Sequence, residues 1–298
     1  MTKIRNARTK GTCLTLFLLL MTLGCAFYAS AAQDPVFPEG YPEELRSKKL
    51  RDSEFREIAP GVNYYHYHFD DIEGQPLSLY YVVIDWDKAN VKLNLAQCGK
   101  KLKTVMEMVK DKKPLAAVNG AYFRYKGPVT YYPLKIEGKV FLPNDKYDTA
   151  SALVFNDGDF PQIVPQKEYD AYENAIMGYH IWKNGKYALG GEQQSSALAG
   201  DTPLTGIGLN PEKRLLVFMV CDGRFKDESP GLNFYGEGYF LIAAGCTDVI
   251  SIDGGGSCTM LIKEKKKGLE LKNRPSDNRK FDHKGARKVH NCIYLTGK

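Results

Sequence analysis

The sequence predicts an α+β (mixed α/β) single domain, with a central mixed sheet of short strands and a few flanking helices. Short apolar or alternating runs, bounded by Gly, Pro, Asn and Asp, recur along the chain and outnumber the segments with helical spacing. No repeat or low-complexity linker interrupts residues 61–298, and this length can bury a sizeable core. We therefore expect one folded domain over residues 61–298.

The strand predictions rest on local pattern. Residues 61–69 alternate aromatic with polar side chains, whereas residues 79–84 and 115–118 are uninterrupted apolar runs. Turn residues near 137–138 and 210–213 indicate two hairpins. In chain order, we expect strands within residues 61–69, 79–84, 91–96, 115–118, 132–140, 152–155, 176–182, 207–221, 249–252 and 289–295.

Two segments have helical spacing. Apolar residues over 102–109 predict a short amphipathic helix that stops near Pro114. Those over 235–244 predict a second helix, with Gly245 as its stop. The lysine-rich segment 263–267 is expected to be the solvated tip of a hairpin.

The first 32 residues have the pattern of an export signal. Four basic residues precede an apolar run that is too short to span a membrane, and small residues at 29–32 suit signal peptidase. Cleavage before Cys25, with a lipid anchor there, is left open as an alternative. We expect an exported protein, periplasmic or extracellular, without a transmembrane segment in the mature chain. Residues 33–60, rich in proline and charge, are expected to form an extended lead-in.

Net charge and cysteine content limit the partners and the kinds of site that the sequence can support. The formal charge of +6 falls to about +2 without the signal, because the signal holds four basic and no acidic residues. A near-neutral surface argues against nucleic acid as a partner. Five cysteines remain at irregular spacing, which is typical of buried small side chains and leaves one or two disulfides as an alternative.

Residues 251–260, Ser-Ile-Asp-Gly-Gly-Gly-Ser-Cys-Thr-Met, carry the strongest functional signal. They follow an apolar strand, and their backbone amides and hydroxyls suit an oxyanion, since glycine lets backbone N–H groups approach a ligand closely. A strained turn with an Asp cap is the alternative. Cys258 is an alternative nucleophile, although no histidine is placed beside it by the sequence.

Three more polar clusters follow or join predicted strands. Residues 119–123 form a turn whose two aromatic side chains suit a sugar, with a plain hairpin turn as the alternative. Residues 222–224, Asp-Gly-Arg, place a carboxylate beside a guanidinium, although Asp-Gly is also a common turn. Residues 273–277 are a polar loop.

The sequence predicts no metal site and no cofactor. His66 and His68 share one strand face, but no third ligand accompanies them. A divalent cation between Asp222 and Asp253 is left open, because paired carboxylates bind hard cations.

The four motifs, which follow one another along the chain at residues 119–123, 222–224, 251–260 and 273–277, together resemble the phosphodiester glycosidase domain family over roughly residues 60–297. The family's Asn-Gly-Gly-Phe-Phe element corresponds to residues 119–123, and its Asp-Gly-Gly-Gly-Ser core corresponds to residues 253–257. Where relatives usually have Pro-Arg-Thr-Ala-Ile-Gly, this chain has Pro-Leu-Thr-Gly-Ile-Gly, so Leu204 replaces an arginine suited to substrate phosphate. The cations that remain to compensate are Arg224, Arg274 and Arg287.

The resemblance implies a hydrolase that cleaves a sugar-1-phosphodiester at the anomeric C–O bond, giving a free sugar and a phosphomonoester, and the N-terminal signal implies that it is exported. Two alternatives stay open: a hydrolase of an ordinary glycoside or cell-envelope polymer, and a noncatalytic carbohydrate-binding protein. The catalytic candidates are Asp253, Asp222 and Glu237. The substrate-binding candidates are Asn119, Gly120, Tyr122, Phe123, Thr205, Arg224, Gly254, Gly255, Gly256, Ser257, Thr259, Asn273, Arg274 and Ser276.

Overall fold

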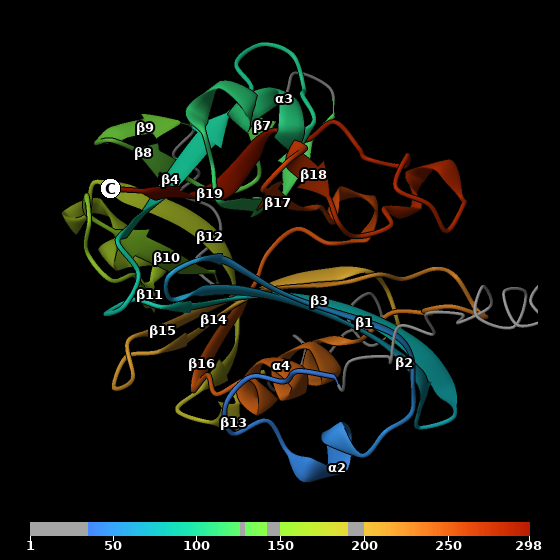
Figure 1. Ribbon diagram of the computed structural model, residues 1–298. Coiled ribbons are helices and arrows are strands. Elements are labelled where there is room, and N and C mark those ends of the chain that lie inside the picture. Colours follow the sequence, from blue (N-terminus) through green and yellow to red (C-terminus); the bar gives the residue numbers. More distant parts are fainter. Residues whose placement is uncertain (1–34, 126–128, 142–149, 190–199) are drawn as a thin grey trace, which may run out of the picture. The chain divides into compact units, whose positions relative to one another are not determined.

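Two β-sheets pack face to face, and helices cover the outer face of each (Figure 1). The computed structural model describes residues 35–125, 129–141, 150–189 and 200–298, which belong to a single unit. The expected signal at 1–32, with Cys25, lies outside the described residues.

The larger sheet contains twelve strands within the described residues. In order across the sheet these are β1 (Leu50–Ala59), β2 (Val62–Ile72), β3 (Gln75–Asp85), β15 (Leu215–Cys221), β14 (Leu204–Asn210), β16 (Asp248–Ser251), β12 (Asn174–Lys183), β10 (Ser151–Phe155) and β11 (Gln162–Pro165). β13 (Lys186–Tyr187) and β8 (Leu134–Ile136) also pair with β12, and β9 (Lys139–Phe141) pairs with β8.

The smaller sheet has five strands in the part of the chain that the structure describes. Their order is β18 (Gly268–Leu271), β17 (Met260–Glu264), β5 (Ala116–Asn119), β19 (Asn291–Gly297) and β4 (Val91–Gln97). A separate two-stranded ribbon joins β6 (Phe123–Arg124) to β7 (Val129–Thr130).

Short helices complete the layers. α3 (Val105–Val109) begins with a capping box at Thr104, and α4 (Phe234–Ala243) is capped by Asn233. The other helices in the described residues are α2 (Glu43–Arg46) and the 3₁₀ turns η1 (Lys110–Lys112), η2 (Gln166–Ala171), η4 (Gly255–Ser257) and η5 (Ser276–Asn278). Within the described ranges, no helix combines the length and the apolar character that a membrane span requires.

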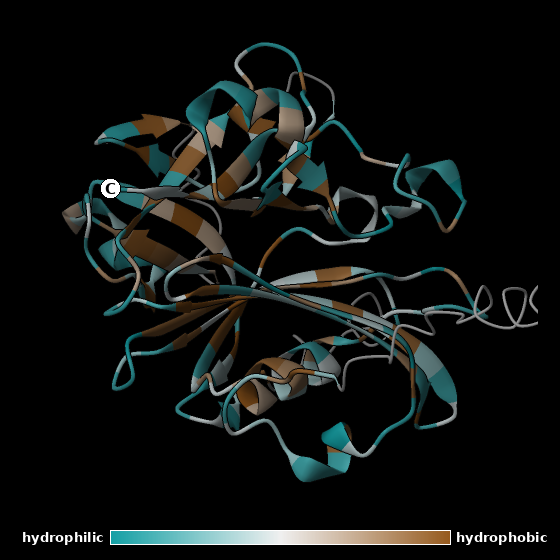
Figure 2. Cartoon of the chain, in the orientation of Figure 1, coloured by the Kyte–Doolittle hydropathy of each residue, from teal (hydrophilic) through white to brown (hydrophobic). Residues whose placement is uncertain are grey.

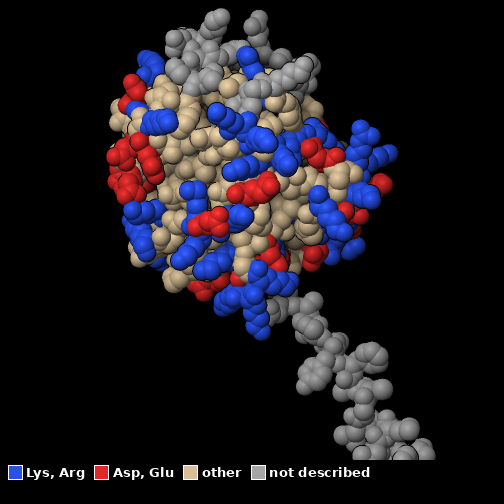
Figure 3. Space-filling model, turned by 90° about the horizontal axis from the view of Figure 1, so that it is seen from above, with Lys and Arg blue, Asp and Glu red and all other residues tan. Residues whose placement is uncertain are grey.

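Strand alternation divides the core into layers. On β2 and β3, Tyr64 and Tyr80 pack between the sheets, whereas Tyr67 and Tyr81 pack on the outer face with α4. α3 covers a third cluster on the outer face of the smaller sheet. Figure 2 shows hydrophobic residues concentrated in the strands, with hydrophilic residues over the hairpin tips and α2. The face seen in Figure 3 carries charges of both signs interspersed.

The predicted strands and both predicted helices are present, and the α+β class holds in a sheet-dominated form. Strand direction differs from the prediction of a mixed sheet, because every strand pair in the described residues is antiparallel. Short hairpins suffice to join antiparallel strands, whereas parallel strands need long crossovers. The expected lead-in also differs: Leu50–Ala59 form β1, paired along the sheet edge with β2.

Asn119, the last residue of β5, joins the two sheets. Its Oδ1 accepts from Thr205 Oγ1 of β14 over 2.9 Å and from Thr259 N over 3.1 Å. Its Nδ2 donates to Asp253 O over 2.6 Å. The side chain is fully buried, so these bonds replace the water that its polar atoms lose on folding.

Asn119→Ala is expected to lower the free energy of unfolding by about 2–4 kcal/mol, because the partners of the amide lose their hydrogen bonds in the interior. Asn94→Ala is the control, since Asn94 Nδ2 also makes two bonds, but at a half-buried position on β4. Denaturant unfolding of both variants measures the difference. Equal losses would contradict a special role for Asn119 between the sheets.

Candidate functional site

Polar segments that follow several strands meet at one end of the two sheets. Residues 252–259 carry the chain from β16 in the larger sheet to β17 in the smaller one. Asn119 Nδ2 donates to Asp253 O over 2.6 Å, and Asn273 Nδ2 donates to Cys258 O over 3.0 Å. These bonds join three of the four predicted motifs.

The triglycine segment admits two guanidinium groups at close range. Gly255 has φ +61°, and a Cβ there would lie 2.8 Å from Arg224 Nη2. A Cβ on Gly256 would lie 2.3 Å from Arg287 Nη2. Glycine is favoured at position 255 by its positive φ, and a side chain at position 256 would displace Arg287 and Asp277, whose Oδ1 would lie 1.9 Å from the Cβ.

Arg224 borders a polar pocket of about 460 Å³ beside this turn. Its guanidinium is exposed, and Nη1 donates to the buried Ser276 hydroxyl over 3.4 Å. The pocket is lined by Arg224, Phe225, Ser276, Asp277 and Arg279. Arg287 forms a bidentate ion pair with Asp277, at 2.8 Å and 2.5 Å. Arg224 and Arg279 are left without a carboxylate partner among the described residues, so this pocket suits an anion.

Asp253 alone among the three catalytic candidates is partly exposed. Its N–H donates to Gly120 O over 3.2 Å, so its backbone is held at the end of β5. Burial raises the pKa of Asp253 to about 6, and the Ser257 hydroxyl and the Arg287 guanidinium offset part of that rise. A carboxyl group that titrates near neutral pH is suited to proton transfer.

Asp222 is buried at the end of β15, with both oxygens in hydrogen bonds. Tyr80 Oη donates to Oδ2 over 2.9 Å, while Oδ1 accepts from Arg274 N over 2.8 Å and from Asn273 Nδ2 over 3.4 Å. Burial raises the pKa of Asp222 to about 7, although these donors lower it. The carboxylate thus anchors the loop after β18 and brings Asp222-Gly223-Arg224 into the site as the fourth motif.

Glu237 projects from α4 against β14 and β16. A Cβ on Gly206 would lie 2.8 Å from its Oε1, so the glycine makes room for the carboxyl group. Neither Glu237 oxygen has a hydrogen-bond partner of ordinary geometry within the described residues, and the Ser251 hydroxyl likewise has none. Burial raises the pKa of Glu237 to about 8, with a smaller lowering by Ser251. Glu237 is therefore mainly neutral at neutral pH.

Several substrate-binding candidates hold the backbone of the site. Thr205 and Thr259 are buried, and their hydroxyls donate to Asn119 Oδ1 and Ser257 O. Gly120 donates its N–H to Asn291 O over 3.0 Å. A Cβ on Gly254 would lie 2.8 Å from Pro203 O. Arg274 Nη1 donates to Tyr80 Oη over 2.5 Å, and its guanidinium stacks 4.5 Å from the Phe281 ring centroid.

The two aromatic candidates lie in different places. Tyr122 meets Tyr179 at a ring-centroid distance of 5.8 Å, and Tyr179 meets Phe234 at 5.8 Å. Burial and then the Asp253 charge raise the pKa of Tyr122, which places its hydroxyl near that carboxylate. Phe123 instead packs in the cluster beneath α3. The structure therefore brings Tyr122, and not Phe123, to the site.

Cys258, the alternative nucleophile, is buried, and His66 and His68, the possible metal ligands, are hydrogen-bonded to other groups. Cys258 is fully buried, and burial raises the pKa of its thiol, so the thiolate is disfavoured. His66 bonds to Ser78, and His68 donates to Glu228 O over 2.9 Å. No group of three or more His, Cys, Asp or Glu converges in the described part of the chain. A divalent cation at this site stays an open prediction.

Sequence reasoning missed Tyr80 and Tyr179 and gave Arg287 only a compensating role. Tyr80 lies in the apolar run of β3, where tyrosine is typical of core packing. No local pattern marks Tyr80 as a partner of Asp222, because the two residues meet only when β3 pairs with β15. Leu204 is buried, with its Cδ2 at 3.2 Å from where a Gly254 Cβ would lie.

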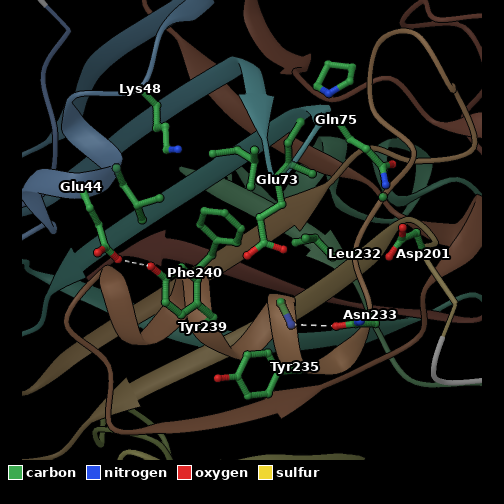
Figure 4. Close-up of a pocket in the computed structure, with 16 residues that line it drawn as sticks. Glu44, Lys48, Glu73, Gln75, Asp201, Leu232, Asn233, Tyr235, Tyr239 and Phe240 are labelled. Atoms are coloured by element: carbon green, nitrogen blue, oxygen red, sulfur yellow. Dashed lines mark hydrogen bonds between the residues drawn. The ribbon is translucent and has the colours of Figure 1, made fainter.

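Another pocket, of about 540 Å³, includes none of the predicted site residues (Figure 4). Glu44, Glu73, Asn233 and Tyr239, which are among its lining residues, come from α2, the β2–β3 hairpin and α4. The Tyr239 hydroxyl donates to Glu44, and Asn233 Oδ1 accepts from Gly236 N over 2.9 Å. These bonds fasten α2 to α4 and cap α4.

Comparison with solved structures places the fold. The catalytic domain of zebrafish N-acetylglucosamine-1-phosphodiester alpha-N-acetylglucosaminidase, described as auto-inhibited by its pro-peptide, matches with a TM-score of 0.63 and 15% identity, over 89% of this chain and 95% of that one. A hypothetical protein from Synechocystis matches with a TM-score of 0.59 and 11% identity, over 84% of this chain and 64% of that one. At these identities the likeness shows the fold.

Comparison of sequences identifies the family. The SPbeta prophage-derived uncharacterized protein YomE of Bacillus subtilis (strain 168) is 27% identical over 172 residues, which are 54% of this chain and 26% of that protein. The chain thus matches only about a quarter of the length of this curated relative. A family model described as phosphodiester glycosidase matches residues 112–296, more than half of the chain. This match includes all four motifs of the site, and the chain belongs to the phosphodiester glycosidase family.

Proposed function

We propose that this protein is an exported hydrolase that cleaves a sugar-1-phosphodiester at the anomeric C–O bond, releasing a free sugar and a phosphomonoester. The observation that carries the proposal is that the partly exposed Asp253 and the Arg224 guanidinium flank the same glycine turn. Membership of the phosphodiester glycosidase family and the fold shared with the zebrafish glucosaminidase domain support it. The export signal expected at residues 1–32 supports the location.

The phosphate is assigned to the pocket beside Arg224. Arg224 supplies an exposed guanidinium, and Ser276 a hydroxyl within its reach. When the C–O bond breaks, the bonding electrons stay on the phosphate oxygen, so negative charge grows there. A nearby guanidinium stabilises that charge and lowers the need for a strong general acid.

The sugar is assigned to the side of Asp253 that faces Tyr122. Tyr122, Tyr179 and Phe234 form a row of ring contacts, and aromatic faces pack well against the apolar faces of sugars. Asp253 takes the proton from the attacking water, whose oxygen bonds to the anomeric carbon. The same carboxylate, when ionised, stabilises positive charge on the sugar ring.

The other two carboxyl groups receive supporting roles in this proposal. Asp222 orients the loop that carries Arg274 and Ser276, because its oxygens are occupied by donors from that loop and from Tyr80. Glu237 is buried behind Ser251 as a neutral group. Leu204 offers no cation, so the phosphate charge is balanced by Arg224, with Arg287 on the other side of the turn.

Asp253→Asn is expected to cut turnover of a sugar-1-phosphodiester by at least ~10²-fold, because the amide cannot accept the proton of water. Product release by the variant is compared with the wild type and with Asp111→Asn, a change at an exposed residue of η1. Parallel assays with a chelator test the divalent-cation alternative. Undiminished turnover by Asp253→Asn would remove this carboxylate from the chemistry.

Arg224→Gln is expected to lower kcat/KM for the phosphodiester by about 10–100-fold, the range for loss of a hydrogen bond to a charged group. Cleavage of the matching simple O-glycoside should change little, because that substrate has no phosphate. Arg46→Gln, on the exposed surface of α2, serves as the control. Preferred cleavage of the O-glycoside by the wild type would favour an ordinary glycosidase. Sugar-phosphate binding without product would favour a noncatalytic binding protein.

Glu237→Gln is expected to change how stability depends on pH. The pKa of Glu237 is raised in the folded state, so its contribution to stability is fully present below pH 4.5 and is lost as pH rises toward about 8. The slope of this loss is about 1.4 kcal/mol per pH unit. Denaturant unfolding across this range should show a flatter profile for the variant than for Glu168→Gln, a change at an exposed residue. A profile equal to that of the wild type would show that Glu237 ionises freely when folded.

A further inference from the structure

Four side chains, His66, Ser78, Tyr80 and Asp222, form a hydrogen-bond chain that ends at the Asp222 carboxylate. His66 Nε2 lies 3.2 Å from Ser78 Oγ, Ser78 Oγ donates to Tyr80 Oη over 3.0 Å, and Tyr80 Oη donates to Asp222 Oδ2 over 2.9 Å. The four residues come from β2, β3 and the end of β15, which are neighbours in the larger sheet. Each is at most 4% exposed.

The number of protons on each group determines the direction of donation along this hydrogen-bond chain. Each hydroxyl has one proton, which Tyr80 gives to Asp222 and Ser78 gives to Tyr80. Ser78 Oγ must therefore accept from His66, so His66 carries its proton on Nε2 while Asp222 is ionised. Burial lowers the pKa of His66 to about 3, with Arg274 adding to the effect, so the ring is neutral.

His66, at the outer end of the hydrogen-bond chain, borders a polar pocket. The pocket has a volume of about 530 Å³ and is lined by Asp52, Glu54, Tyr64, His66, Tyr80, Lys267, Glu270, Leu271, Lys272, Arg274 and His283. His66 Nδ1, the ring nitrogen not used by Ser78, lies 4.0 Å from the exposed Asp52 Oδ2. A solvent proton that enters this pocket therefore meets the lone pair of Nδ1.

We propose that His66, Ser78 and Tyr80 form a proton relay that connects the buried Asp222 carboxylate with solvent in this pocket. A solvent proton bonds to His66 Nδ1 as Nε2–H passes to Ser78, the Ser78 proton passes to Tyr80, and the Tyr80 proton passes to Asp222 Oδ2. One proton enters and one carboxylate is neutralised. After the transfer, the direction of donation is reversed in every hydrogen bond of the chain, and His66 is in its other neutral tautomer.

The donors that bond to Oδ1 of Asp222 determine which oxygen of the carboxylate takes the added proton. Oδ1 accepts from Arg274 N and Asn273 Nδ2, so an added proton resides on Oδ2, where it faces Tyr80. Tyr80 must then donate to Ser78, and Ser78 to His66 Nε2. Because His66 is neutral before and after, its low pKa does not block the path. Arg274 Nη1 donates to Tyr80 Oη in either state.

Charged and titratable groups on the surrounding elements affect the protonation of His66 and Asp222. Those that act on His66 are Arg274, His68, Lys272 and His283, with Asp52 facing Nδ1. Those that act on or respond to Asp222 are Tyr80, Arg274, Tyr64, Cys221 and Cys258. Apart from His68, whose replacement by the uncharged glutamine is the matched control on the same strand, these positions are left unchanged in the tests.

The relay matters for the loop that Asp222 holds. Protonation of Oδ2 weakens the acceptor for Arg274 N, which lies two residues before Ser276. The step to catalysis rests on the proposed function, in which this loop helps to bind phosphate. The relay itself is a property of the folded protein, and the following measurements separate the two.

Nitrogen NMR of the wild-type protein gives the first test and requires no variant. The His66 tautomer should change from Nε2–H to Nδ1–H as pH falls, with the same midpoint as carbon NMR reports for the Asp222 carboxyl group. His68 should keep its Nε2–H, because that nitrogen donates to Glu228 O in both states. A His66 tautomer that stays constant while Asp222 titrates would overturn the relay.

Two variants give the second test, by infrared detection of the Asp222 carboxylic acid band after a pH jump. His66→Gln keeps a donor for Ser78 but cannot exchange tautomers, so protonation should slow by ~10²-fold. Ser78→Ala should slow it similarly, whereas the control His68→Gln, at an equally buried position on β2, should match the wild type. Wild-type rates in both relay variants would show direct solvent access to Asp222 and overturn the proposal.

Turnover assays then address the link to function. If the wild type cleaves phosphodiesters, His66→Gln should alter the pH profile of kcat/KM while His68→Gln leaves it unchanged. If the wild type cleaves none but the NMR and infrared results are as expected, the relay stands and the proposed function fails. An unaltered profile in His66→Gln, despite slowed protonation, would overturn the step from the relay to phosphate binding.

Discussion

The site depends on the crossing of the chain from the larger sheet to the smaller one at residues 252–259. This segment is not part of a strand ladder, and its backbone is held by bonds to Thr205 O, Gly120 O and Pro203 O as well as by side chains. Asn119 bonds to its beginning and Asn273 to its end, and both amides are buried. A buried amide holds backbone on both its donor and acceptor sides, which makes the crossing rigid without regular secondary structure.

The three carboxyl groups differ because of their surroundings. Asp253 is partly exposed, Asp222 is buried with donors around it, and Glu237 is buried without hydrogen bonds of ordinary geometry. Their pKa values rise in that order, to about 6, about 7 and about 8. Burial is the main cause in each case, and donors determine how far the rise goes. The site thus contains three carboxyl groups that burial makes harder to ionise.

Leu204 supplies no cation to the glycine turn, so other segments supply the cations there. The side chain packs beneath Gly254, where the resemblance places an arginine in relatives. The glycine turn is instead flanked by Arg224 and Arg287, one of them exposed and the other paired with Asp277. An exposed guanidinium is screened by water more than a buried one, so Arg224 attracts an anion more weakly than a buried arginine would.

The sequence alone predicted the sheet-rich class, the positions of the main strands and α4, and the four motifs that meet at the site. Apolar periodicity marks strands, and Gly, Asn and Asp mark their ends, so both are local properties that a sequence displays. Tertiary structure decided the antiparallel pairing, the inclusion of residues 50–59 in a sheet and the split into two sheets. It also decided that Tyr122 reaches the site while Phe123 does not, and that Asp222 is enclosed by Tyr80. These outcomes depend on which strands pair and which face each side chain occupies, and some of the contacts, such as that of Tyr80 with Asp222, join residues far apart in the sequence.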